Sequence, residues 1–299
     1  MSRILITGST GFIGRNLVTY LLKNTEHNLF LINRNRKITH KDKNITNFHY
    51  DQQITNLISF FNEVRPEIVI HLATNYVKEH NSKDISSLIS SNILFGNEIL
   101  EAMANSQCKK IINFGSYFQN VGSQSVYMPA NLYAATKQSL DNIIKYYSEN
   151  HDLNFITLKF FDTFGPNDNR NKLVDFLIKS SLSNENIILS NANKIIDLSH
   201  ISSIIEHILH SISYLLTTNQ KLNESFFISG FRLKLKDIVL SIEKATGKKI
   251  NCSYGNFKYM KTTAYKVLLN NEPPWKSKMK DKNFDLLIKD MVINHDSKK

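Results

Sequence analysis

Residues 3–14 read RILITGSTGFIG, and this stretch decides the fold. A short β-branched run, Ile4–Thr7, leads into a glycine-rich turn, and an apolar helix is predicted to follow over Phe12–Lys23. The glycines are three residues apart: Gly8, Gly11 and Gly14. A glycine turn lets the backbone approach a pyrophosphate, and the N–H groups and positive dipole end of the helix face that anion. Because glycine triplets also arise by chance, the strand before the turn and the helix after it are what indicate a dinucleotide-binding unit.

Over the first 160 residues, short apolar runs alternate with helical patterns, which is typical of a parallel sheet covered by helices on both faces. The expected strands are Ile4–Thr7, Leu29–Asn33, Ile68–Leu72, Ile111–Phe114 and Phe155–Phe160. The expected helices are Phe12–Lys23, Gln53–Val64, Ser87–Ala104 and Leu132–Asn150. Beyond Gly165 the pattern loosens, with helices expected near Leu173–Ser181, at Ile201–Leu216 and from Lys236, and strands at Ile187–Leu189 and Ser225–Ser229.

The predicted fold class is therefore α/β. Residues 1–165 are expected to form a doubly wound parallel Rossmann sheet that binds a dinucleotide. Residues 166–299 are expected to form a smaller, mixed C-terminal substrate lobe, with the chain free to interleave between the two. Such a lobe would cover the carboxyl ends of the strands, where open α/β sheets bind their ligands.

The composition places the chain among ordinary globular proteins: 41% of its 299 residues are hydrophobic and 21% are charged. No stretch approaches the roughly 18 consecutive apolar residues of a membrane span, and the N-terminus does not have the pattern of a signal peptide. Two cysteines, Cys108 and Cys252, offer neither a disulfide framework nor a metal site. We therefore expect a cytoplasmic protein without a membrane partner and without a bound metal.

The formal net charge of +11 raises the question of nucleic-acid binding. The lysines are scattered, however, and no stretch interleaves them with aromatic residues as a stacking platform for bases would. A positive field also attracts anionic small molecules such as nucleotides. We therefore expect no nucleic-acid partner; the charge is compatible with a nucleotide ligand, and genome base composition without a function is the alternative explanation of the many lysines.

Three side chains are expected to carry the chemistry: Ser116, Tyr133 and Lys137. Tyr133 and Lys137 are four residues apart at the start of a predicted helix, so they project from one face. Ser116 follows a predicted strand at its carboxyl end. A phenol with an ordinary pKa near 10 is a poor acid or base at neutral pH, but a neighbouring ammonium lowers that pKa. The set suits proton transfer at an alcohol oxygen, whereas the spacing alone also fits an amphipathic helix with a solvated lysine.

The glycine turn, Ser116 and the segment YAATK (133–137) together resemble the extended short-chain dehydrogenase/reductase family, specifically its nucleotide-sugar branch. Supporting segments are HLA (71–73), Asn92 in the next helix, and FDTFGP (161–166). The resemblance implies that the dinucleotide contacts the glycine turn, the segment after the third strand, and the Tyr–Lys pair. The cofactor-binding residues implied are Gly8, Thr10, Gly11, Phe12, Ile13, Gly14, Leu72, Ala73, Tyr133 and Lys137.

The resemblance also implies substrate contacts at Ser116, Asn92 and Asp162. Asp162 stands where the family has asparagine in a segment that meets the substrate phosphates. Asn92 fits equally well as a buried helix residue that satisfies backbone groups. Arg170, at the opening of the predicted substrate lobe, is the better candidate for a phosphate partner, and a solvated loop arginine is the alternative.

The end of the second strand distinguishes the two nicotinamide cofactors. NAD enzymes place an acid there to accept from the ribose 2′-OH, whereas this chain has NRNRK over 33–37. The guanidinium groups of Arg34 and Arg36 suit a 2′-phosphate by charge and by bidentate geometry. A basic surface turn is the alternative, but the pattern favours NADP(H) over NAD(H). Asp51 resembles the family's adenine-contacting aspartate and also fits a simple loop acid.

The residues after Ser116 bear on the reaction. The family's 4,6-dehydratases carry an Asp–Glu pair there, whereas this chain has YFQ over 117–119, so a dehydratase is not expected. The segments GSYFQN (115–120), NLYAATKQ (131–138) and FDTFGPND (161–168) resemble 4-keto-sugar reductases of the CDP-abequose and CDP-paratose synthase type. Two alternatives stay open: a nucleotide-sugar epimerase, which needs the same trio, and a non-enzymatic dinucleotide sensor, although such sensors typically lose the Tyr or the Lys.

By this resemblance, NADPH is expected to reduce the C4 keto group of a CDP- or dTDP-linked 4-keto-6-deoxyhexose or its 3,6-dideoxy counterpart. Tyr133 would donate the proton, Ser116 would bind the same oxygen, and Lys137 would hold the nicotinamide ribose. The product would be a deoxysugar donor for bacterial surface polysaccharide such as the O-antigen of lipopolysaccharide. Relatives are commonly homodimers, and we expect the same here.

Overall fold

The computed structural model describes residues 1–34, 42–121, 127–255, 272–275, 277 and 282–296. Its centre is a seven-stranded sheet in which all paired strands are parallel. The strands, in their order across the sheet, are β10 (Asn223–Ile228), β6 (Asn154–Phe160), β5 (Lys110–Ser116), β4 (Ile68–His71), β1 (Arg3–Thr7), β2 (Asn28–Asn33) and β3 (Ile45–His49). The order reverses between β1 and β4, and this switch point is where such sheets bind ligands.

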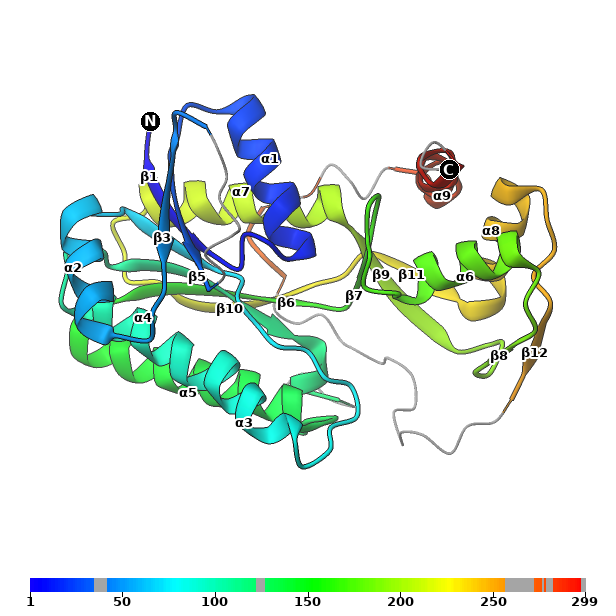
Figure 1. Cartoon of the computed structure of the whole chain (residues 1–299), viewed down its shortest axis with the longest axis horizontal. Helices are drawn as coiled ribbons and strands as arrows, with labels where there is room; N and C mark the ends of the chain where they lie inside the picture. Colours follow the sequence, from blue (N-terminus) through cyan, green and yellow to red (C-terminus); the bar gives the residue numbers. More distant parts are fainter. Residues whose placement is uncertain (35–41, 122–126, 256–271, 276, 278–281, 297–299) are drawn as a thin grey trace.

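The strands are apolar because helices cover both faces of the sheet. On one face, α1 (Phe12–Asn24) and α7 (Ile201–Thr217) pack on side chains such as Ile4, Ile6 and Ile112. On the other face, α2 (Ile54–Val64), α4 (Phe95–Ala104) and α5 (Leu132–His151) pack on side chains such as Leu5, Val69 and Ile111. Figure 1 shows the two helical layers with the sheet between them. The predicted doubly wound sheet is confirmed.

The helix expected over Ser87–Ala104 is present, with an earlier start and a change of winding. It runs as α3 (Asp84–Ile89), a π-helical turn η1 (Ser90–Leu94) and α4. Such π turns are frequent at functional sites. A short 3₁₀ turn, η2 (Tyr117–Gln119), directly follows β5.

The C-terminal lobe is mixed, as predicted, and has its own core. A three-stranded sheet contains β11 (Phe231–Lys234), β9 (Ile195–His200) and β7 (Asp162–Phe164), with β9 antiparallel to β11 and parallel to β7. A two-stranded sheet pairs β8 (Ile187–Leu189) with β12 (Cys252–Tyr254). The helices of the lobe are α6 (Leu173–Ser183), α8 (Leu235–Thr246) and α9 (Phe284–Asp296). Side chains from these helices and sheets form a third apolar cluster.

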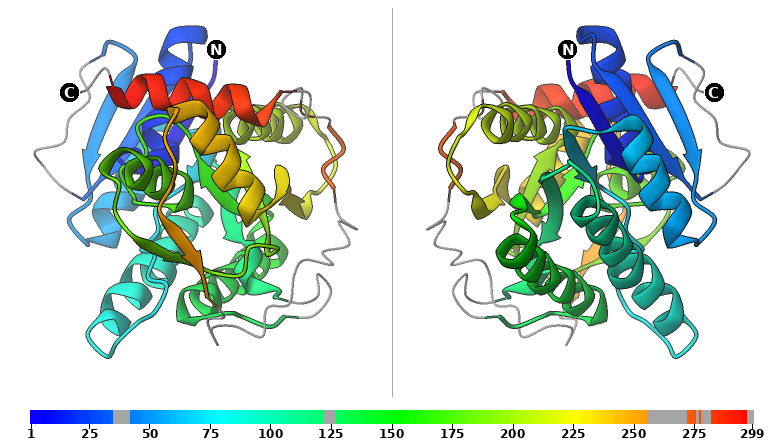
Figure 2. Two further views of the ribbon diagram at one scale, coloured as in Figure 1. Left: turned by 90° about the vertical axis from the view of Figure 1, so that its right-hand side faces the viewer. Right: turned by 90° about the vertical axis from the view of Figure 1, so that its left-hand side faces the viewer.

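Two elements that follow β7 in the chain are part of the Rossmann unit: one helix packs on the large sheet, and one strand extends it. Helix α7 packs on β5 and β6, and β10 pairs in parallel with β6 along its whole length. The chain therefore leaves the Rossmann sheet after β6, builds part of the lobe, returns for α7 and β10, and then completes the lobe (Figure 2). No helix within the described residues is long and apolar enough to cross a bilayer.

Candidate active site

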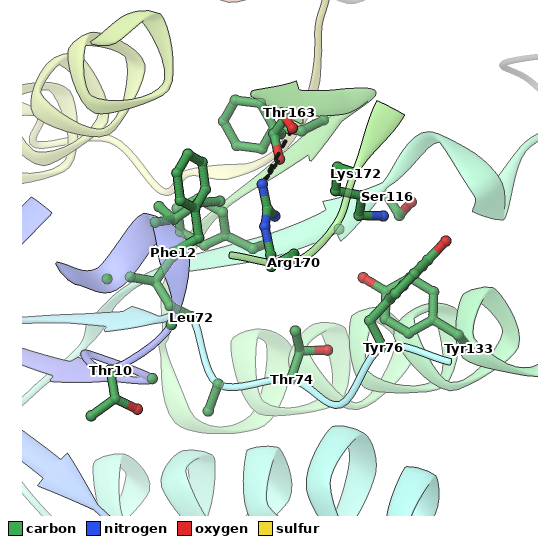
Figure 3. Close-up of a pocket in the computed structure, with 18 of the residues that line it drawn as sticks. Thr10, Phe12, Leu72, Thr74, Tyr76, Ser116, Tyr133, Thr163, Arg170 and Lys172 are labelled. Atoms are coloured by element: carbon green, nitrogen blue, oxygen red, sulfur yellow. Dashed lines mark hydrogen bonds between the residues drawn. The ribbon is translucent and has the colours of Figure 1, made fainter. Parts of the chain in front are cut away.

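A cavity of about 870 Å³ lies at the carboxyl ends of the central strands. It is lined by residues that follow β1, β2, β4, β5 and β6, and by residues 170–172 from the segment before α6. Figure 3 shows several of these side chains directed into the same space. The cavity thus coincides with the switch point at which a ligand was predicted.

The glycine turn closes one end of this cavity, and its shape requires glycine. Gly8 has φ +70°, and a Cβ there would lie 2.6 Å from the backbone nitrogen of Ala73. A Cβ on Gly14 would lie 2.2 Å from the carbonyl oxygen of Gly8. Gly11 donates its N–H to that same oxygen at 3.0 Å, and α1 begins at the next residue. The turn therefore leaves its backbone and the first N–H groups of α1 open to an anion, which fits a dinucleotide pyrophosphate.

Most of the predicted cofactor residues line this cavity. They are Gly8, Thr10, Gly11, Phe12, Ile13, Gly14, Arg34, Leu72, Ala73 and Tyr133. Asp51 lies apart from it: its carboxylate is exposed and accepts from Asn56 Nδ2 at 2.7 Å and from the N–H of Gln53 at 3.0 Å. Arg36 lies outside the described residues.

Asn33 is a cavity residue that the sequence did not single out. It is the last residue of β2, and its Oδ1 accepts from Ser9 Oγ at 2.9 Å. This bond ties the end of β2 to the glycine turn. The signal in the sequence is its position at the carboxyl end of a buried strand, directly before Arg34.

The structure brings two of the three predicted catalytic residues to the cavity wall. Ser116 ends β5, Tyr133 lies in the first turn of α5, and both are largely buried. Helix α5 is capped by Asn131, whose side chain accepts from the N–H of Ala134 at 2.9 Å. Lys137 lies one turn further along and is 1% exposed. It is therefore part of the layer directly behind the cavity wall.

Burial controls the protonation of both helix residues. It raises the pKa of Tyr133 to about 12, and a hydrogen bond with Thr74 acts in the opposite direction. It lowers the pKa of Lys137 to about 8, against the attraction of Asp141. The expected lowering of the tyrosine pKa by the lysine is thus not what the structure shows: desolvation raises this pKa, and the opposing contribution comes from Thr74. At neutral pH the phenol carries its proton, and it is suited to act as an acid.

Asn92 lies in the π turn, is fully buried and does not line the cavity. Its Oδ1 accepts from Thr74 Oγ1 at 3.1 Å and from the N–H of Asn75 at 2.6 Å. Its Nδ2 donates to the Asn75 carbonyl at 2.9 Å and to Thr136 Oγ1 at 3.0 Å. Thr136 in turn donates to the carbonyl of Tyr133 at 2.7 Å. Asn92 therefore fastens the loop after β4 to the helical turn that carries the phenol.

Of the other predicted substrate residues, Asp162 and Arg170 line the cavity. The Arg170 guanidinium contacts the Asp168 carboxylate at 2.6 and 2.7 Å, donates to Thr163 Oγ1 at 3.0 Å, and lies 4.1 Å from the centre of the Phe12 ring. Its charge is thus paired within the protein. Burial raises the pKa of Asp162, and the nearby cations, Lys172 foremost, act against that rise.

The cavity residues that were missed on the substrate side include Tyr76, Lys78 and Lys172. The Tyr76 ring is edge-on to Tyr133, with the ring centres 4.9 Å apart. The Lys172 ammonium lies over the Tyr76 ring, 3.9 Å from its centre. Tyr76 and Lys78 follow the HLA segment in the loop after β4, and a loop at the carboxyl end of a central strand is the signal that could have found them.

Comparison with known proteins agrees with this fold and cavity. The model of the NAD dependent epimerase/dehydratase family matches residues 4–221, and the chain belongs to this family. The predicted membership of the extended short-chain dehydrogenase/reductases is confirmed.

Among curated proteins, CDP-abequose synthase of Yersinia pseudotuberculosis is 30% identical over 261 residues, which cover 86% of this chain and 88% of that protein. CDP-abequose synthase of Salmonella muenchen is 26% identical over 262 residues, with coverage of 85% and 84%. Among solved structures, MoeE5 in complex with UDP-glucuronic acid and NAD has a TM-score of 0.81 at 17% identity, covering 99% of this chain and all of that one. UDP-N-acetylglucosamine 4-epimerase from Methanobrevibacter ruminantium has a TM-score of 0.82 at 18% identity, with coverage of 100% and 99%. These structures show the same fold.

Proposed function

We propose that this chain is an NADPH-dependent reductase of the C4 keto group in a nucleotide-activated 4-keto-6-deoxyhexose or its 3,6-dideoxy counterpart. Its product would be a deoxysugar donor for bacterial surface polysaccharide such as the O-antigen, made in the cytoplasm. The similarity to two CDP-abequose synthases over more than four fifths of the chain supports a nucleotide-sugar substrate. The observation that carries the choice of reaction is this similarity to CDP-abequose synthases, together with the buried Tyr133 and Ser116 that share one cavity.

A reduction needs an acid at the carbonyl oxygen, whereas oxidation of an alcohol, the first half of an epimerisation, needs a base. The raised pKa of Tyr133 suits the phenol to the acid's part in a reduction. The residues after Ser116 do not supply the acid–base pair of a dehydratase: Phe118 lines the cavity, and the Tyr117 ring stacks on Phe161 with the centres 4.7 Å apart. These aromatic side chains form an apolar wall beside the hydroxyl.

In the proposed mechanism, a bound nicotinamide supplies the hydride. Ser116 donates a hydrogen bond to the C4 oxygen and orients the keto group. Tyr133 gives its proton to the alkoxide that forms there. Lys137, charged at neutral pH behind the cavity wall, stabilises the phenolate left behind. The family resemblance also implies a contact with the nicotinamide ribose, which would require its ammonium to reach past that wall. Water is excluded on one side by Phe118 and Phe161.

The proposed cofactor is NADP(H). Arg34 follows β2 directly, is exposed and lines the cavity. Asn33, in the position before it, is neutral, so the described end of β2 has no carboxylate to repel a 2′-phosphate. A guanidinium in this place suits that phosphate by charge and by geometry.

For the diphosphate of a CDP- or dTDP-linked sugar, we propose Lys172 as the main partner and Lys78 as a second. Both line the cavity. Arg170, whose guanidinium is already paired with Asp168, would act by shaping the segment that carries Lys172. Asp162 lies at the same end of the cavity and would offer its carboxyl group to the sugar.

The proposed assembly is a homodimer. Exposed apolar side chains gather on α3 and η1: Ile85, Ile89 and Leu94 are 45%, 41% and 51% exposed. Helix α3 lies beside α5 (Figure 1), where Tyr146 is 57% exposed. Sedimentation of the chain and of a Leu94→Lys variant tests this: a dimer that the variant converts to a monomer supports the assignment, and a wild-type monomer refutes it.

The reaction is tested by mixing the protein, NADPH and a freshly prepared CDP- or dTDP-linked 4-keto-6-deoxy sugar, then following the absorbance of the reduced nicotinamide. Oxidation supports the reductase, and a parallel series with NADH decides the cofactor. Isomerisation of a nucleotide sugar with catalytic NAD, without net oxidation, would establish the epimerase instead. Dinucleotide binding with no turnover of either kind would establish a sensor.

A further inference from the structure

A buried polar network lies directly behind the proposed catalytic residues, and the mechanism above makes no use of it. At its centre is Asp141, one helical turn after Lys137 on α5 and 8% exposed. Its Oδ1 accepts from Asn113 Nδ2 at 2.9 Å, and its Oδ2 accepts from Gln119 Nε2 at 2.7 Å. The Lys159 ammonium on β6 lies 3.6 Å from the same Oδ2. Burying a carboxylate and an ammonium costs free energy, so this arrangement calls for an explanation.

Gln119 connects the network to Ser116. Gln119 is fully buried, and its Oε1 accepts from the N–H of Ser116 at 2.8 Å. Ser116 Oγ accepts from the N–H of Phe118 at 3.3 Å, so that the two residues form a reciprocal capping box around η2. The backbone N–H of Ser116 is therefore held by Gln119, whose own amide is anchored on Asp141, while the Ser116 side chain is held by the N–H of Phe118.

Charge connects the network to Lys137. Lys137 is buried, and Asp141 is the carboxylate that attracts its ammonium. Lys159, from β6, shares this carboxylate and also donates to Asn120 Oδ1 at 3.3 Å. His71, from β4, also faces Lys137, but burial lowers its pKa to about 3 and it is uncharged at neutral pH. The Asp141 carboxylate is thus the negative charge that attracts two buried ammonium groups, those of Lys137 and Lys159.

We propose that Asp141 and Gln119 are positioning residues of the active site: Asp141 keeps Lys137 charged, and Gln119 transmits the anchoring of that carboxylate to Ser116. This inference rests on the proposed function for its activity readout but not for its stability readout. A purely structural network predicts a loss of stability with no change in where Lys137 titrates. The positioning role predicts that removing the carboxylate makes Lys137 lose its proton at lower pH.

The test compares Lys159→Met with the double variant Lys159→Met/Asp141→Asn. In both variants the second buried ammonium is absent, so the amine that titrates near position 141 is Lys137, and removing the carboxylate in the double variant affects Lys137 alone. Because the folded pKa of Lys137 is below its unfolded value, stability rises with pH from that folded pKa upward. In the double variant, this rise should begin about one pH unit lower or more. The alkaline limb of the kcat–pH profile should move in the same direction.

Two further variants separate the roles. Gln119→Met should lower kcat about tenfold or more, with KM for NADPH unchanged, and the alkaline limb should not move to lower pH. Glu149→Gln, which removes an exposed acid from the same helix, should leave both profiles in place. If the stability profile shifts but no keto sugar is reduced, the network stands and the proposed function fails. If the sugar is reduced and neither profile shifts in the double variant, the positioning role is refuted.

Discussion

Replacing Lys137 with methionine should make the protein more stable and inactive. Lys137 is 1% exposed, and burial lowers its pKa from 10.5 to about 8. Each pKa unit corresponds to about 1.4 kcal/mol, so the charged lysine costs the folded state about 3 kcal/mol at neutral pH. Methionine has nearly the same length and carries no charge. Lys137→Met should therefore raise the free energy of unfolding by up to about 3 kcal/mol, which for a chain of this size is on the order of 5 °C in Tm.

The pH dependence gives the sharper test. A group whose folded pKa is lower than its unfolded pKa binds more protons when unfolded, so wild-type stability rises between the two values. The advantage of Lys137→Met should thus be full below about pH 8 and shrink between about pH 8 and pH 10.5. Denaturant unfolding of both proteins from about pH 6 to pH 11 measures this difference, and Lys145→Met, at an exposed lysine of the same helix, is the control. A difference that is constant with pH, or a less stable methionine variant at neutral pH, refutes the reasoning.

Three further predictions concern the proton donor, the cofactor and the glycine turn. Tyr133→Phe should lower turnover by about 10²–10⁴-fold with NADPH binding nearly intact; wild-type turnover would remove Tyr133 from the mechanism. Arg34→Ser should raise KM for NADPH by about tenfold or more, because one charge-assisted contact is lost, while KM for NADH changes little. Equal effects on the two KM values would argue against a 2′-phosphate contact. Gly14→Ala, whose Cβ would meet the Gly8 carbonyl at 2.2 Å, should abolish dinucleotide binding, whereas Gly11→Ala, at 3.3 Å, should weaken it less; the reverse order, followed by fluorescence of bound NADPH, would contradict the described turn.

The parts of the fold that the sequence predicts well are those in which local pattern and burial agree. The central strands of the large sheet are buried on both faces, so they are continuous apolar runs with boundaries correct to within one or two residues. The glycine turn is equally predictable, because backbone atoms next to Gly8 and Gly14 leave no room for the Cβ of another residue type.

The missed strands have patterns that sequence reasoning does not single out. Strand β3 is an edge strand with no fully buried residue. Strand β9 is buried but contains polar side chains, and Asp197 within it is satisfied by Ser229, the N–H of Gly230 and Arg232. Those partners are more than 30 residues away in the chain, so a buried aspartate looks like a loop residue until the fold is known.

The candidate site divides in the same way. Ser116 and Tyr133 are predictable because their strand and helix end at the switch point. The pairing of Arg170 with Asp168 and its contact with the Phe12 ring come from tertiary structure, and they leave Lys172 as the better candidate for a phosphate. The raised pKa of Tyr133 could not be predicted from the sequence either, because it depends on burial and on neighbours such as Thr74 and Tyr76.

The return of the chain for α7 and β10 has a consequence for anyone who wishes to exchange substrate specificity between relatives. The lobe cannot be exchanged at a single boundary, since one graft from residue 161 to the end of the chain would also replace α7 and β10 and so separate β6 from its own edge partner. A functional chimera needs two inserts, one for residues 161–200 and one from residue 229 onward, with the intervening helix and strand kept from the parent that donates the sheet.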